Sequence, residues 1–132
     1  METHHRFPLL AAGVFGALGV GLGAFGAHGL QSLLAAHGTT QSWETAARYH
    51  LMHAIALVGV AAWIQAGAGT GIRRMLWAAR CWSLGIALFS GSLYLYAVGG
   101  PHFMVYLTPI GGVALIAGWV MVIAAACVAK PT

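Results

Sequence analysis

The stretch FPLLAAGVFGALGVGLGAFGA, residues 7–27, decides the fold of this chain. It carries no charged residue, and at about 1.5 Å per helical residue it is long enough to cross a hydrocarbon layer of about 30 Å. The alternative is a cleaved signal peptide, since Arg6 precedes the run and the small residues Gly26 and Ala27 end it. The run is longer than the usual hydrophobic region of a signal peptide, so we predict a membrane-spanning helix.

The composition of the whole chain agrees with a lipid environment. Of the 132 residues, 60% are apolar and only 6% are charged, and the mean hydropathy is +0.82. A soluble domain needs more charge than this on its surface. The formal charge of +4 comes from basic residues beside apolar runs, so it predicts contacts with lipid headgroups and no nucleic-acid partner.

Three further apolar runs predict three further spans, at about residues 45–66, 75–98 and 108–128. Ser42 is the predicted N-cap of the second span, and Thr108 with Pro109 the predicted start of the fourth. Gly99, Gly100 and Pro101 end the third, because proline cannot continue a helix and glycine accepts a positive φ. The expected fold is therefore all-α, a single transmembrane domain over residues 1–132 built as an integral membrane four-helix bundle.

The loop between the first two spans, residues 29–41, predicts a short interfacial helix, because its leucines share one helical face. Basic residues set the orientation of the spans. One side carries Arg6, Arg73, Arg74 and Lys130, with Arg80 close behind, whereas the other side carries Arg48 alone. Both termini are therefore expected in the cytoplasm (N-in/C-in).

Aromatic residues near the span ends agree with this arrangement. Phe7, Trp63 and Trp77 fall at the predicted inner boundary, and an outer belt is expected from Trp43, Tyr49, Tyr94, Tyr96 and Tyr106. Trp82 and Trp119 lie deeper, where we expect them to pack inside the bundle.

Small residues are expected to hold the helices together, because the hydrophobic effect does not drive helices together within lipid. The first span has a GxxxG pair, Gly19 and Gly23, and a second ridge of small residues formed by Gly13, Ala17 and Gly21. In the fourth span, Ala114 and Gly118 have the same spacing. Two ridges on one helix suit either two neighbours in the same chain, or one neighbour in the same chain and one in a second copy.

Histidines are the most informative polar residues. His28, His37, His50, His53 and His102 all fall toward the predicted outer side, and His53 lies near the middle of the membrane. In a functional interpretation, His53 with His50 or His28 binds a metal or haem, or relays protons. In a structural interpretation, which we favour, a neutral His53 bonds to Ser90, Ser92 or a backbone carbonyl across the bundle.

Two other polar groups are candidates for a site. Glu44 and Arg48 have the spacing of a helix ion pair, and with His28 and His50 they are candidates for an outward-facing pocket for a small anion or a lipid headgroup. Ser92 and Tyr94 place hydroxyls near the outer end of the third span. The chain has no aspartate, and Glu2 and Glu44 fall on opposite sides, so neither a Ser/His/Asp triad nor a pair of catalytic carboxylates is available.

Four motifs in order resemble a known family: GAFGAHGL (23–30), WETAARYHLMHAIAL (43–57), LFSGSLY (88–94) and TPIGGVALIAGW (108–119). The chain resembles the bacterial inner-membrane family catalogued as domain of unknown function 423, to which a eukaryotic transmembrane protein family is related. The resemblance implies a compact four-helix bundle in the bacterial inner (cytoplasmic) membrane. It implies no reaction and no catalytic residue.

We therefore expect a non-enzymatic membrane protein that acts by association with itself, with lipid or with a larger membrane complex. One alternative is a metal or haem site at His28, His50 and His53. The other is a small proton-coupled carrier in which His53 titrates.

Overall fold

The computed structural model describes residues 2–67 and 69–129. Lys130, which entered the charge count above, lies outside these residues. All regular structure in the described part is helical. Its elements are α1 (Glu2–Ala27), α2 (Gln31–His37), α3 (Thr40–Gln65), α4 (Ile72–Gly85), the π-helix η1 (Ile86–Ser90), α5 (Gly91–Ala97) and α6 (Met104–Ala126).

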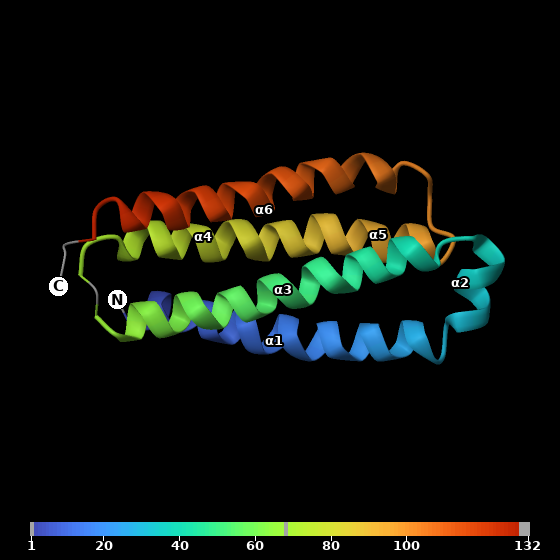
Figure 1. Ribbon diagram of the computed structural model, residues 1–132, viewed down its shortest axis with the longest axis horizontal. Helices are drawn as coiled ribbons and strands as arrows, with labels where there is room; N and C mark the ends of the chain where they lie inside the picture. The colour runs from blue at the N-terminus through green and yellow to red at the C-terminus, as the bar shows by residue number, and fades with distance from the viewer. Residues whose placement is uncertain (1, 68, 130–132) are drawn as a thin grey trace.

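Four long rods lie side by side in the order α1, α3, α4–η1–α5 and α6 (Figure 1). The start of α1, the turn between α3 and α4 and the end of α6 lie at one end of the molecule. The short helix α2 lies at the opposite end, across the direction of the rods, together with the connection from α5 to α6. It is the short helix predicted between the first two spans, and its Leu34 is buried.

Three of the helices are long and apolar enough to cross a membrane. They cover residues His5–Ala27, Thr40–Gln65 and Met104–Ala126, with mean hydropathies of 1.9, 1.2 and 2.1. Much of their surface is apolar and exposed, including Leu10, Ile55 and Ile116, as a lipid environment requires. The predicted third span is helical from Ile72 to Ala97, but η1 divides it into shorter α-helical pieces.

Two predicted helix starts are wrong. The second helix begins at Thr40, earlier than the predicted N-cap Ser42. The last helix begins at Met104, so Thr108 is not its N-cap and Pro109 lies inside the helix. Proline is tolerated there because it removes only one backbone donor, within the first two turns.

The interface of α1 with α3 explains why α1 has so many small residues. Its more buried positions alternate in steps of four and three, the spacing of a left-handed coiled coil: Pro8, Ala12, Phe15, Gly19, Leu22 and Gly26. A Cβ atom on Gly19 would lie 2.7 Å from Cδ2 of Leu51, and one on Gly26 would overlap the indole of Trp43. Glycine at these two positions therefore lets the backbones approach closely.

The π-helix η1 lies where the backbones of α6 and its neighbour approach closely. A Cβ atom on Gly111 of α6 would overlap the backbone of Phe89. Around η1 the buried positions recur every four residues, at Trp82, Ile86, Ser90 and Tyr94, rather than every 3.6. The extra residue of the π turn thus keeps Trp82 against α6 while Ser90 and Tyr94 face α3.

Candidate functional site

His53, near the middle of α3, uses both of its ring nitrogens within the chain. Its Nε2 accepts a hydrogen bond of 3.1 Å from the indole N–H of Trp119 in α6. Nε2 therefore carries no proton, and Nδ1–H donates to the carbonyl of Tyr49, one turn earlier in α3, at 2.7 Å. The ring is neutral and is 4% exposed. Neither nitrogen offers a free lone pair to a metal.

Two tryptophans surround this histidine. Trp82 is 1% exposed, donates its indole N–H to the carbonyl of Leu115 at 3.1 Å, and lies 4.7 Å from Trp119 between ring centroids. Gly118 lies directly against the Trp82 indole, where a Cβ atom would overlap the ring. Trp119 itself is 48% exposed, so it lies at the edge of the bundle rather than fully inside it as we predicted.

His50 lies one turn from His53 and faces a different set of neighbours. Its Nδ1 is 3.1 Å from the hydroxyl of Tyr94 in α5, and its ring meets Phe15 of α1 edge-on at 5.8 Å. Its Nε2 is fully buried without a hydrogen-bond partner. Such an orphan group destabilises a fold, on the order of 1–3 kcal/mol.

The serines of the third rod bond to groups other than histidine. Ser90 donates to the carbonyl of Ala46 in α3 at 2.8 Å. Ser92 Oγ is 2.7 Å from the hydroxyl of Thr108 in α6 and donates to the carbonyl of Phe89 at 3.0 Å. The predicted bonds from His53 to Ser90 or Ser92 are therefore wrong: the inter-helix partner of His53 is Trp119, and its backbone partner belongs to its own helix.

Two members of the predicted outer aromatic belt are inside the bundle instead. Trp43 is 5% exposed and donates to the carbonyl of Leu22 in α1 at 3.0 Å. Tyr94 is 8% exposed, packs against the Trp43 ring at 4.6 Å between centroids, and bonds to His50. Both side chains therefore find partners in the chain rather than in lipid headgroups.

The charged residues do not form the predicted pocket. No ion pair within 4.0 Å joins Glu44 and Arg48 in the described part of the chain, and both side chains are exposed. His28 is exposed at the end of α1, whereas His50 is buried between α1 and α3. The structure brings Glu44 into a cleft, but without His28, His50 or Arg48.

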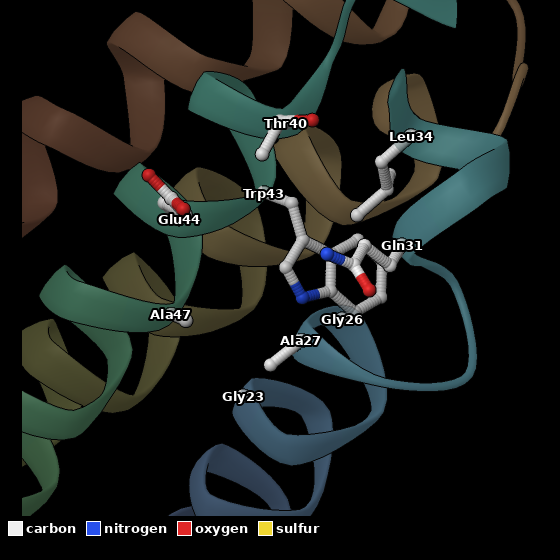
Figure 2. Close-up of a pocket in the computed structure, with 9 residues that line it drawn as sticks. All are labelled: Gly23, Gly26, Ala27, Gln31, Leu34, Thr40, Trp43, Glu44 and Ala47. Carbon is white, nitrogen blue, oxygen red and sulfur yellow. The ribbon is translucent and has the colours of Figure 1, made fainter. Parts of the chain in front are cut away.

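That cleft, here called the α1–α3 cleft, lies where α1 ends, α2 turns and α3 begins (Figure 2). Its volume is about 270 Å³. Small and apolar residues make its floor, and polar groups from α2 and α3 line the rest. The lining residues are Gly23, Gly26, Ala27, Gln31, Leu34, Thr40, Trp43, Glu44 and Ala47.

Sequence reasoning found Glu44 and Gly23 but missed Gln31 and Thr40 as members of this cleft. Gln31 begins α2, and no local pattern specifies how that short helix lies against α3. Within the described residues, no group of three or more His, Cys, Asp or Glu side chains is close enough to hold a metal ion.

The packing glycines fall into two groups. Gly19, Gly26, Gly111 and Gly118 touch neighbouring helices, whereas Gly13, Gly21 and Gly23 have nothing within 4 Å of an added Cβ atom. Ala114 is partly buried in α6. The Gly19–Gly23 pair thus contacts α3 at its first member only.

Long apolar helices whose interior polar groups bond mostly to one another define a multi-pass integral membrane protein. The family model for a protein of unknown function, DUF423, matches residues 22–112, and the chain belongs to this family.

The chain is similar to two bacterial membrane proteins over most of its length. It is 43% identical over 109 residues to the UPF0382 membrane protein YwdK of Bacillus subtilis, covering 83% of this chain and 86% of the relative. It is 36% identical over 126 residues to the UPF0382 inner membrane protein YgdD of Escherichia coli K12, covering 92% and 89%. No solved structure matches the chain. The protein is a multi-pass protein of the bacterial cytoplasmic membrane, as predicted.

Proposed function

We propose that this protein crosses the membrane four times with both termini in the cytoplasm, and that it acts without catalysis, by association with a second copy of itself. The observation that carries the proposal is the open small-residue ridge of α1, formed by Gly13, Ala17 and Gly21.

The fourth crossing is the rod α4–η1–α5. It is helical without a break over residues 72–97, about 39 Å at the rise of an α-helix, and it lies between α3 and α6 (Figure 1). A rod that is packed between two membrane-spanning helices lies at the same depth in the bilayer as they do. Arg6, Arg73 and Arg74 belong to the end of the molecule where α1 starts and α3 turns into α4, which supports a cytoplasmic location for that end.

The ridge lies on the face of α1 turned away from α3. Gly13, Ala17 and Gly21 are exposed, and an added Cβ atom on either glycine would meet nothing within 4 Å. Glycine inside a helix costs about 1 kcal/mol relative to alanine, and contacts within the chain do not offset that cost here. Close packing with a helix of another molecule would offset this cost.

The surface beside the ridge is hollow. A groove of about 870 Å³ runs along it, lined by Gly13 and Ala17 together with Arg6, Leu9, Leu10, Val14 and Gln65. A two-fold axis normal to the membrane preserves the orientation of both copies and brings the same ridge together from each side. The ridge is self-complementary in this arrangement, as in small-xxx-small helix pairs. Lipid chains need no glycine to pack, so a second copy is the occupant that the sequence of the ridge favours.

Disulfide cross-linking in membranes tests the association. In a chain carrying Cys81→Ala and Cys127→Ala, we expect Ala17→Cys to give cross-linked dimers on mild oxidation. The matched control Ile116→Cys, which is also exposed but lies on α6, should give none. Adding Gly21→Leu to the Ala17→Cys chain should lower the dimer yield about tenfold, the effect of about 1.4 kcal/mol in association free energy. Equal cross-linking at positions 17 and 116, or no dimer at position 17, would show that lipid covers the ridge.

A further inference from the structure

We propose that the α1–α3 cleft binds the phosphoethanolamine headgroup of a phospholipid, with the ammonium at Glu44 and the phosphate at the first turn of α3. This site is separate from the ridge on α1 and does not depend on self-association.

The cleft lies at the end of the bundle, which in the proposed four-crossing arrangement is the level of the lipid headgroups. It is formed at the end of the bundle by α2, which runs across the rods, and by the adjoining ends of α1 and α3 (Figure 1). An amphipathic helix in this position lies along the membrane interface. The cleft volume of about 270 Å³ is below the usual range of pockets for drug-sized molecules, so it suits a headgroup and not a whole lipid.

Glu44 supplies the charge that recognises an ammonium. It is the only acidic side chain among residues 5–129, and the structure does not pair it with Arg48. Its carboxylate is therefore free to accept hydrogen bonds from a bound ammonium, and such charge-assisted bonds are stronger than neutral ones.

The first turn of α3 supplies donors for a phosphate. Thr39 precedes the helix, but its hydroxyl donates to the carbonyl of Ala97 at 2.7 Å, so it does not cap the helix. The first amides of α3 thus lack a side-chain cap, and uncapped amides at a helix start favour a phosphate. Thr40 and Gln31 also line the cleft, with the Gln31 amide beside the Trp43 indole and the Thr40 hydroxyl at the first turn of α3 (Figure 2).

The spacing of these groups fits a zwitterion. Thr40 and Glu44 are four residues apart, so they are neighbours on one face of α3, about 5–6 Å apart at Cβ. Phosphate and ammonium in phosphoethanolamine are joined by only two methylene groups. The floor formed by Gly23, Ala27 and Ala47 is small and apolar, as the glycerol end and the first methylenes of a lipid require.

The cleft favours an ethanolamine over a choline headgroup. A trimethylammonium has no N–H to donate to Glu44 and is usually held by exposed aromatic faces. Trp43 lines the cleft but is only 5% exposed, with its indole N–H bonded to Leu22. Recognition therefore rests on hydrogen bonds from a primary ammonium.

Native mass spectrometry of the full chain in detergent tests this site with three probes: phosphatidylethanolamine, phosphatidylcholine and phosphatidylglycerol with identical acyl chains. We expect phosphatidylethanolamine to bind at least about tenfold more tightly than the other two. Glu44→Gln should lower that affinity about tenfold, since hydrogen bonds to a charged acceptor are stronger than those to a neutral one. The control Glu2→Gln removes the chain's other carboxylate and should change nothing. Equal binding of all three lipids, or an unaltered affinity in Glu44→Gln, would overturn the proposal.

A second pair of variants controls for a general loss of structure. An added Cβ atom at Gly23 or at Gly21 would meet nothing within 4 Å, but only Gly23 lines the cleft. Gly23→Leu should abolish the preference for phosphatidylethanolamine, whereas Gly21→Leu should keep it and weaken dimers instead. Competition by soluble glycerophosphoethanolamine at a similar concentration would assign the site to the free headgroup, and competition only by the lipid would assign it to the membrane. Loss of preference in Gly21→Leu and not in Gly23→Leu would refute the cleft as the site.

Discussion

At the scale of single residues, the buried histidines have different environments although they are three positions apart. His53 is satisfied at both ring nitrogens, and the bond from Trp119 links α6 to α3. His50 has one partner, Tyr94, and one buried nitrogen without any. A histidine that carries protons or binds a metal needs a nitrogen that can change its partner. The geometry of His53 favours the structural interpretation.

The bond between His53 and Trp119 should be measurable as a coupling. Each of His53→Ala and Trp119→Phe should lower the free energy of unfolding, by roughly 1–3 kcal/mol, since Trp119→Phe leaves the acceptor Nε2 of His53 buried without a donor. The double variant should lose less than the sum, with a coupling of about 0.6–1.7 kcal/mol, the range seen for hydrogen bonds between membrane helices.

Unfolding in mixed detergent micelles, followed by tryptophan fluorescence, gives the three free energies. His53→Ala with unchanged stability would contradict the structural role and return the histidine to the functional candidates.

At the scale of elements, the π-helix η1 has no counterpart in the prediction. The i→i+5 bonding of a π turn includes one more residue than an α turn, and η1 uses it to turn Ser90 and Tyr94 toward α3. Removing one residue from η1 should therefore restore a regular helix with both flanks still in register.

We expect deletion of Ala87, which is exposed within η1, to leave a folded chain destabilised by less than about 2 kcal/mol. Deletion of Ile55, exposed in the regular helix α3, should unfold the chain, because it rotates Leu57, Val60 and Ile64 by about 100° away from the core. Thermal unfolding in detergent distinguishes the two deletions. An equal loss of stability in both deletion variants would show that η1 does not accommodate the removal of a residue.

The elements that could be predicted from the sequence are the ones that composition alone indicates. Apolar runs gave three membrane-length helices and a helical third segment, and Gly99, with φ of 93°, follows the end of α5 as expected. Starts were less predictable, because Thr40 and Met104 begin helices through tertiary packing rather than through a cap, and neither helix has a side-chain cap bond. The partners of His53 and the cleft at Glu44 depend on which helices lie side by side, which no local pattern encodes.

At the scale of the whole molecule, the proposed orientation predicts which loops are accessible from outside the cell. In a chain with Cys81→Ala and Cys127→Ala, a cysteine replacing Phe103, between α5 and α6, should react with a membrane-impermeant maleimide in intact cells. A cysteine replacing Thr70, in the turn between α3 and α4, should react only after the membrane is opened. The reverse pattern would contradict the proposed topology, and labelling of both sites in intact cells would contradict an odd number of crossings between them.

The side-chain hydrogen bonds of the described residues are distributed unevenly among the four rods. Bonds join α3, the α4–η1–α5 rod and α6 to one another, whereas α1 receives a single one, from Trp43 to Leu22. α3 is also the least hydrophobic of the three membrane-length helices, with a mean hydropathy of 1.2 against 1.9 for α1.

This distribution has a consequence for biosynthesis, because the chain enters the bilayer from its N-terminus onward. α1 is apolar enough to remain there alone, but α3 enters before the helices that carry Tyr94 and Trp119, the hydrogen-bond partners of its own histidines. The face of α1 that carries Gly19 and Gly26 is then the first protein surface available to α3, so we expect α3 to pack on α1 before the other helices enter.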